Sequence, residues 1–303
     1  MSKPTKITVF GAANVDITGF PDAELVFKDS NTGQVKISAG GVGRNIAENL
    51  KLLKFDTELI GIFGDDPLSD FLIKDCRTKG LQINRSLFLK NMPASTFIAI
   101  LDNHNDLAVG ISAMQLYDNT VDNLFITNLP DKIDSEYVIL ETNLSGRILE
   151  AIIEKYPGKK LVLDTVSGKK ALRAKNILKH LYILKTNLLE AEMLSGIKVQ
   201  NDHDIKKLVS FFIERGVNKV FITLGQQGVI YGTQNIIERQ KPVPATIKNT
   251  TGAGDSFVAG IVYAGILQKN IRDMATYGMR MAALTVGCEE AVTPKVSQLV
   301  SSK

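Results

Sequence analysis

Asn249-Thr250-Thr251-Gly252-Ala253-Gly254-Asp255-Ser256-Phe257 joins three small residues to a carboxylate and leads directly into an apolar run. Small residues allow a backbone to approach a ligand closely, and a helix can begin among them. The apolar side chains that follow have a helix-compatible spacing, at Phe257, Val258, Ile261, Val262, Ala264 and Gly265. We therefore predict that a helix begins here, with Asp255 in its first turn.

The start of such a helix suits a phosphate group. Its first N–H groups lack partners within the helix, and the positive end of the helix dipole lies there. A carboxylate beside a nucleotide γ-phosphate could take the proton from an attacking hydroxyl while the N–H groups stabilise the growing negative charge. The alternative is a glycine turn in which Asp255 only caps the helix. Local chemistry does not separate the two interpretations.

Strand-like and helix-like segments alternate along most of the chain. Helical patterns cover Val42 to Leu53 and, after the Asp66-Pro67 start signal, the segment to about Lys79. The strand candidates are Ile7 to Phe10, Thr57 to Phe63, Tyr137 to Leu140, Leu161 to Leu163, Tyr182 to Leu184 and Val220 to Leu224. This alternation predicts an α/β fold: a doubly wound, mostly parallel sheet flanked by helices.

Two regions break the alternation. Gln34 to Ser38 is a strand candidate just before the first helix, and Thr96 to Leu101 with Leu107 to Ile111 flank a polar turn, Asp102-Asn103-His104-Asn105-Asp106. Consecutive strands without a helix between them do not belong in a doubly wound sheet. We predict one domain over residues 1–303, with a small β-sheet lid formed by about residues 15–38 and 95–114.

Composition excludes several classes of protein. The chain has 303 residues, 44% hydrophobic and 22% charged, as in a soluble globular protein. Charges interrupt every apolar stretch before the roughly 18 residues of a spanning helix. The polar start, Met1 to Lys6, leaves no room for a secretory signal. We expect a cytoplasmic protein without membrane contact.

The net charge and the distribution of cysteine and histidine argue against two further kinds of partner, nucleic acid and a metal ion held by His and Cys. A net charge of +4 and the absence of tryptophan do not favour nucleic-acid binding. The cysteines Cys76 and Cys288 form no CxxC pair, which indicates free thiols in a reducing compartment. The three histidines are scattered, so we expect no His/Cys metal site.

Four motifs, in the order and spacing of one family, resemble the ribokinase-like sugar and nucleoside kinases. They are Thr251-Gly252-Ala253-Gly254-Asp255, Gly40-Gly41 followed by Asn45, Asn14-x-Asp16 after the first strand, and Asn187-x-x-Glu190 after a later strand. The resemblance extends from roughly Lys6 to Pro294. It implies a ribokinase-like fold and an ATP-dependent phosphotransferase with an alcohol group as acceptor.

The resemblance also implies roles by position. Asp255 matches the catalytic base, and Gly252, Ala253 and Gly254 match the anion hole. The positions that match contacts to substrate hydroxyls are Asn14, Asp16, Gly40, Gly41, Asn45 and, at a strand end, Glu141. The positions that match the nucleotide site are Asn187, Thr223, Gly225 and Gly228. Glu190 matches the residue that organises Mg²⁺, through water, since magnesium keeps much of its hydration.

Two further expectations follow from the family. Its lids often form the dimer contact, so the resemblance implies a homodimer through the lid. Many members have aspartate where Asn249 stands, in a region linked to a monovalent cation. Asparagine keeps the carbonyls but loses the charge, so the resemblance does not decide whether K⁺ activates the protein.

Within the family, the segment Ser38 to Leu50, with Arg44 directly before Asn45, resembles pseudouridine kinases more than ribokinases or fructokinases. Met92-Pro93-Ala94-Ser95-Thr96, Asp164-x-x-Ser167-x-x-Lys170 and Asn249 point the same way, whereas Ala113 stands where those enzymes are expected to have aspartate. The implied reaction transfers the ATP γ-phosphoryl group to the 5′-hydroxyl of pseudouridine. The alternatives are a kinase of another nucleoside or sugar (ribose, fructose, inosine or adenosine) and a ligand sensor on the same fold.

Two nucleotide-binding classes fit the sequence poorly. Gly41-Val42-Gly43 is similar to the start of a GxGxxG dinucleotide loop, but Ile46 occupies the third glycine position and would crowd the helix–strand packing. A Walker-type GxxxxGK[ST] sequence does not occur.

The presence of Asp255 favours an enzyme over a ligand sensor, because a protein that only binds its ligand has no need of a base.

Overall fold

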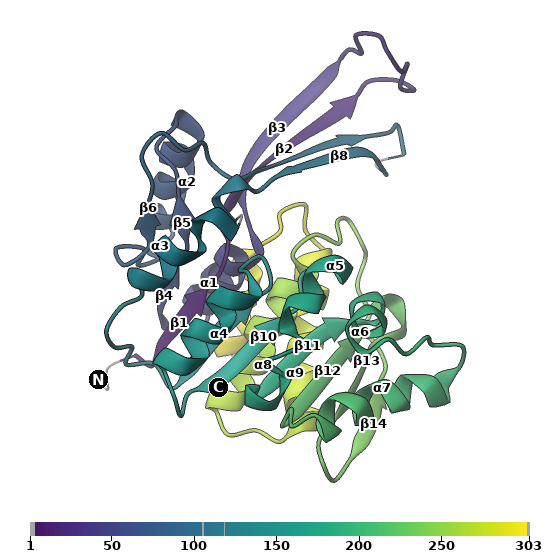
Figure 1. Ribbon diagram of the computed structural model, residues 1–303. Coiled ribbons are helices and arrows are strands. Elements are labelled where there is room, and N and C mark those ends of the chain that lie inside the picture. The colour runs from purple at the N-terminus through teal and green to yellow at the C-terminus, as the bar shows by residue number, and fades with distance from the viewer. Residues whose placement is uncertain (1–3, 105, 118, 302–303) are drawn as a thin grey trace.

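The computed structural model describes residues 4–104, 106–117 and 119–301. Residues 1–3 of the polar N-terminus and Asn105 of the predicted turn therefore lie outside the described residues. A large sheet lies between two sets of helices, and a small sheet extends away from this body (Figure 1). None of the helices in the described part of the chain is both long and apolar enough to cross a membrane.

Over the described residues, the large sheet has the strand order β14-β13-β12-β11-β10-β9-β1-β4. Its strands are β1 (Lys6–Phe10), β4 (Asp56–Ile60), β9 (Tyr137–Glu141), β10 (Lys160–Asp164), β11 (Ile183–Asn187), β12 (Lys219–Thr223), β13 (Val229–Gly232) and β14 (Ile237–Gln240). The strands from β4 to β12 in this order are parallel, and β13 is antiparallel to both of its neighbours, β12 and β14. The predicted doubly wound, mostly parallel sheet is confirmed.

Helices cover both faces of this sheet. The helices are α1 (Val42–Leu52), α2 (Pro67–Thr78), α3 (Asp122–Thr127), α4 (Gly146–Lys155), α5 (Gly168–Ala171), α6 (Leu188–Ser195), α7 (Asp202–Glu214), α8 (Ala253–Ile266), α9 (Ile271–Val286) and α10 (Gln298–Ser301). In β9, Ile139 belongs to the core under α1, α8 and α9, whereas Val138 and Leu140 belong to the core under α4, α6 and α7. Because both faces are buried, the central residues of the inner strands are apolar, as in Val138 to Leu140 of β9 and Leu161 to Leu163 of β10.

The small sheet contains the strands that broke the predicted alternation. It has the order β3-β2-β7-β8, formed by β2 (Asn14–Pro21), β3 (Gly33–Gly40), β7 (Thr96–Leu101) and β8 (Leu107–Ala113). Strands β2 and β7 are parallel, and the other two pairs are antiparallel. These bounds correspond to the two segments that were predicted to form a lid.

One predicted strand, residues 57–63, is divided. β4 ends at Ile60, and β5 (Ile62–Phe63) pairs instead with β6 (Leu87–Phe88) in a separate two-stranded sheet. The chain changes sheet at Gly61, where an added Cβ would lie 2.7 Å from the carbonyl oxygen of Gly11. This close approach requires glycine, and it depends on a contact 50 residues away.

The carboxyl ends of the parallel strands bring polar residues to one edge of the sheet. Glu141, Asp164, Asn187 and Thr223 are the last residues of β9, β10, β11 and β12. Ligands of open α/β sheets bind outside this edge. The fold therefore places four polar side chains from four strands where a site is expected.

Candidate active site

Helix α8 begins at a glycine that packs closely against the backbone of another segment. Its N-cap, Gly252, has φ 79° and ψ −6°, and an added Cβ there would lie 2.0 Å from the carbonyl oxygen of Ala291. The amides of Ala253 and Ser256 donate to the carbonyls of Thr250 and Gly252. Among the described residues, the amides of Gly254 and Asp255 have no hydrogen-bond partner, so both are available to an anion.

Asp255 lies in the first turn of α8 with 8% of its surface exposed. Its Oδ2 accepts a hydrogen bond from Asn45 Nδ2 at 2.9 Å. Burial, with the negative charge of Asp164, raises the pKa of Asp255 to about 7, against the opposing effects of Asn45 and Lys185. The capping alternative does not fit, because Gly252 is the N-cap and the Asp255 carboxylate bonds to another helix.

Sequence reasoning missed Lys185, which lies beside this carboxylate. Its Nζ pairs with Asp164 Oδ2 at 2.8 Å, and both side chains are buried. Burial alone would lower the pKa of Lys185, but the charges of Asp164, Glu190 and Asp255 outweigh it and raise that pKa. A Cβ added at Gly254 would lie 2.7 Å from Lys185 Nζ, so the ammonium lies against the start of α8. A lysine within a strand of otherwise apolar and small residues was the available signal.

The predicted substrate residues of β2, β3 and α1 lie together. Asn14 Nδ2 donates to Asp16 Oδ1 at 2.5 Å, and burial raises the pKa of Asp16. A Cβ added at Gly40 would lie 2.0 Å from Asp16 Oδ2, and one at Gly41, which has φ 102°, would lie 2.6 Å from the Ala12 carbonyl oxygen. Both glycines therefore allow β3 of the small sheet to lead directly into α1 (Figure 1). The contact between Asn45 and Asp255 connects this group to α8.

Glu141 is fully buried at the end of β9. Its carboxylate accepts hydrogen bonds from the backbone amides of Ala12 and Asn143. Burial raises the pKa of Glu141 to about 7, although these two amides act in the opposite direction. The carboxylate therefore holds the segment after β1 against the end of β9. Its predicted contact with the substrate stays a prediction.

A groove of about 280 Å³ brings three of the four predicted nucleotide residues together. It is lined by Asn187, Leu188, Leu189, Thr223, Leu224, Gly225 and Gln227. The fourth, Gly228, closes the turn: its carbonyl accepts from the Leu224 amide at 2.8 Å, and its φ of 90° suits glycine. The groove has apolar leucines beside polar side chains, as expected of a small-molecule site.

Glu190 belongs to the capping box of α6 with Asn187. Oε2 accepts from the Asn187 amide at 3.0 Å and from Thr165 Oγ1 at 2.6 Å, and Oε1 accepts from Asn187 Nδ2 at 2.6 Å. In the described part of the chain, no three His, Cys, Asp or Glu side chains are grouped so that they could hold a metal ion. Both carboxylate oxygens of Glu190 thus already accept hydrogen bonds within the protein, and its predicted role beside a hydrated Mg²⁺ stays a prediction.

The side chain of Asn249 is hydrogen-bonded to a backbone carbonyl near this end of α8. Asn249 Nδ2 donates to the Glu289 carbonyl at 2.9 Å, and Asn249 Oδ1 accepts from the Thr251 amide at 2.9 Å. An aspartate could make the second bond but not the first. The asparagine thus uses a carbonyl oxygen that a cation could otherwise approach.

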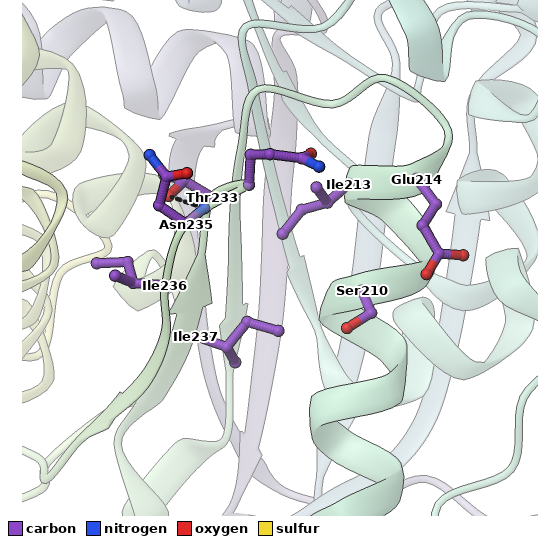
Figure 2. A pocket seen from close by; sticks show the side chains of 8 residues that line it. Ser210, Ile213, Glu214, Thr233, Asn235, Ile236 and Ile237 are labelled. Carbon is purple, nitrogen blue, oxygen red and sulfur yellow. Dashed lines mark hydrogen bonds between the residues drawn. The ribbon is translucent and has the colours of Figure 1, made fainter.

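A second hollow, of about 310 Å³, lies away from these residues. Figure 2 shows it between α7 and the turn that joins β13 to β14. Its lining residues are Ser210, Ile213, Glu214, Thr233, Gln234, Asn235, Ile236 and Ile237. Because Val220 at the start of β12 pairs with Gly232, this turn lies at the amino-terminal edge of the parallel strands. None of the predicted site residues lines it.

Known proteins resemble the chain over nearly its whole length. A pseudouridine kinase of Escherichia coli is 27% identical, covering 98% of this chain and 95% of its own. A ribokinase of Staphylococcus aureus is 30% identical, covering 93% of each. The structure of Arabidopsis thaliana ribokinase complexed with ribose and ATP superposes with a TM-score of 0.81, at 22% identity over 99% of each chain.

The match to a family model extends over residues 4–298, and the model is that of the pfkB family carbohydrate kinases. The matched range includes the glycine turn before α8, the start of α1 and the small sheet. The chain therefore belongs to the pfkB family of carbohydrate kinases, which are phosphotransferases with an alcohol group as acceptor.

Proposed function

We propose that this kinase transfers the γ-phosphoryl group of ATP to the 5′-hydroxyl of pseudouridine, with Asp255 as the catalytic base. The observation that carries the proposal is the position of the Asp255 carboxylate. It is buried at the N-terminal end of α8, hydrogen-bonded to Asn45, and has its pKa raised to about 7. A base with a pKa near the working pH combines a sufficient ionised fraction with a strong tendency to take a proton.

The chain's own residues account for the proton and the charge. Oδ2 of Asp255 is engaged by Asn45, so Oδ1 takes the hydroxyl proton as the phosphoryl group arrives. The amides of Gly254 and Asp255 and the nearby Lys185 ammonium stabilise the negative charge that develops. Mg²⁺, when bound with ATP beside Glu190, would neutralise part of the phosphate charge.

The acceptor is proposed to lie between the small sheet and α1. Asn14, Asp16 and Asn45 supply fixed donors and acceptors of the kind that a ribosyl group requires. The similarity to the Escherichia coli pseudouridine kinase, with the Arg44-Asn45 sequence, supports pseudouridine. The similarity to the Staphylococcus aureus ribokinase supports ribose as the second candidate.

The proposal includes a homodimer formed through the small sheet, which also closes over the acceptor as a lid. The register places Val35, Ile100 and Val109 in one row across the sheet and Ile37, Ile17, Ile98 and Ile111 in the next, all on one face. Val35 is 70% exposed and Ile111 is 57% exposed. Asp16 lies on the opposite face. An apolar outer face on a sheet that faces the site from its other side fits a contact between two copies.

A coupled ADP-release assay tests the proposed function. It compares pseudouridine, uridine, inosine, adenosine, ribose and fructose as acceptors with Mg-ATP, in potassium and in sodium salts. We expect turnover on pseudouridine above the other acceptors. We also expect similar rates in both salts, because Asn249 occupies the Glu289 carbonyl. Turnover on ribose alone would identify ribose as the acceptor in place of pseudouridine and leave the proposed phosphoryl transfer unchanged. No turnover on any acceptor would favour a ligand sensor.

The two cysteines, Cys76 and Cys288, are free thiols. Free thiols are stable in a reducing compartment. A cytoplasmic location is therefore part of the proposal, and fractionation of the native host would test it.

A further inference from the structure

Arg44 is a buried cation one residue before Asn45, with 4% of its surface exposed. Its Nη2 pairs at 2.6 Å with Glu48 Oε2 in α1 and at 2.6 Å with Asp75 Oδ2 in α2. A buried charge is strongly destabilising unless it is paired and hydrogen-bonded. These two carboxylates supply the pairing, and they leave Nη1 for a different partner.

That partner is the acceptor end of the Asn45 amide. Arg44 Nη1 donates to Asn45 Oδ1 at 3.0 Å, and Asn45 Nδ2 donates to Asp255 Oδ2 at 2.9 Å. A side-chain amide has one acceptor end and one donor end. If the amide turned over, its oxygen would face the Asp255 carboxylate and its NH₂ would face the guanidinium, and both contacts would be unfavourable. Arg44 therefore permits only one orientation of the amide.

We propose that Arg44 is a positioning residue, which holds the Asn45 amide in the orientation that donates to Asp255 and so keeps the base ionised and in place. The inference rests on the proposed role of Asp255 as the base. It does not depend on which hydroxyl is the acceptor, since the contacts from Arg44 to Asp255 lie within the protein.

The surroundings of Asp255 make this donor important. The carboxylates of Asp164 and Glu141 and the burial of the site all raise the pKa of Asp255, whereas the Asn45 bond and the Lys185 charge lower it. A carboxyl group with a pKa of about 7 is only partly ionised at neutral pH. The loss of one of the two opposing contacts would move that pKa upward, and the protonated fraction would increase within the working range of the enzyme.

The experiment measures the pH dependence of kcat/KM, which reports on the free enzyme, using any acceptor that is turned over. Arg44→Met removes the guanidinium and keeps an unbranched side chain. We expect the acidic limb to move up by about one pH unit, so that kcat/KM falls about tenfold near pH 6 but stays within about twofold near pH 9. A uniform fall at every pH, with the limb unmoved, would overturn the proposal.

Two control variants separate this effect from stability. Arg85→Met removes an ion pair with the buried Glu58, and Asp75→Asn weakens the anchoring of Arg44 but leaves its contact with Asn45. Both should lower the melting temperature, and neither should move the acidic limb. A limb shift in Arg85→Met equal to that in Arg44→Met would mean that any lost ion pair has this effect, which would also overturn the proposal.

A direct titration of the Asp255 carboxyl group tests the role of Arg44 without an activity measurement. In enzyme labelled with ¹³C at the aspartate carboxyl carbons, the Asp255 signal is the one missing from Asp255→Asn, and its pKa should be higher in Arg44→Met than in the unmodified protein. An unchanged pKa would contradict the role of Arg44. If no acceptor is turned over, the proposed function fails, and this titration still decides whether Arg44 controls the Asp255 carboxyl.

Discussion

The side-chain amide of Asn45 in α1 donates a 2.9 Å hydrogen bond to the carboxylate of Asp255 in α8, across 210 residues of sequence. The bond joins the helix that follows the small sheet to the helix that begins at the glycine turn. It brings the predicted acceptor residues and the predicted base into one site. Both helices cover the same face of the large sheet, with their starts at its carboxyl edge.

The stability of the protein should reflect the raised pKa of Asp255. Between about pH 4 and pH 7 the folded state binds a proton at this carboxyl that the unfolded chain has released, so this group's contribution to stability falls as the pH rises through that window. Asp255→Asn removes the ionisation. We expect the variant to melt at a higher temperature than the unmodified protein at pH 8, with the difference vanishing towards pH 4, in differential scanning fluorimetry. A difference that does not change with pH would contradict the burial of a charge here.

Replacing Gly252 by alanine should destabilise the protein far more than the same change at a surface glycine of similar backbone conformation. Gly252→Ala would place its Cβ 2.0 Å from the Ala291 carbonyl oxygen, whereas Gly158 has φ 78° and, apart from its chain neighbours, no described residue has an atom within 4 Å of a Cβ added there. We expect Gly158→Ala to cost about 1 kcal/mol of unfolding free energy and Gly252→Ala about 3 kcal/mol, because only the second adds a steric clash to the backbone strain. Urea denaturation measures both. Equal costs would show that the turn before α8 relaxes freely.

Lys185 and Asp164 should behave as a coupled pair. Lys185→Met leaves the Asp164 carboxylate buried without its partner, which should cost about 3 kcal/mol of unfolding free energy. The double variant Lys185→Met/Asp164→Asn removes the unpaired charge and should recover most of that stability, while turnover stays low because the cation beside Gly254 is absent. Denaturation and turnover are measured on the same samples. Recovery of turnover along with stability would restrict Lys185 to a structural role.

The sequence predicted the parts of the fold that depend on local pattern. Both faces of the large sheet are covered, so the central residues of its inner strands are apolar, and the turn before Asp255 has small residues from which a helix begins. The change of sheet at Gly61 could not be predicted, because it depends on the approach of Gly11 in three dimensions. The place of Lys185 beside Asp255 and the buried contacts of Arg44 could not be predicted for a similar reason. A lysine or arginine in a sequence does not reveal that carboxylates from other elements surround it.

The apolar face of the small sheet should hold two copies of the chain together. Ile37→Glu combined with Ile111→Glu places charges on that face, and Ser112→Glu places one on the opposite face of β8 as a control. Light scattering after size-exclusion chromatography should give a dimer for the unmodified protein and for the control, and a monomer for the double variant, because charge is unfavourable in an apolar contact. A monomeric unmodified protein at micromolar concentration would contradict the dimer.

The most direct test of the central claim is the single-turnover rate of Asp255→Asn, measured beside its affinity for ATP. Asparagine keeps the size of the side chain and an oxygen that can accept from Asn45, but it cannot take the proton from the acceptor hydroxyl. If Asp255 is the base, the rate should fall at least about a thousandfold while the dissociation constant of ATP changes by less than about threefold. A rate close to that of the unmodified enzyme, with ATP binding unchanged, would show that another group takes the proton.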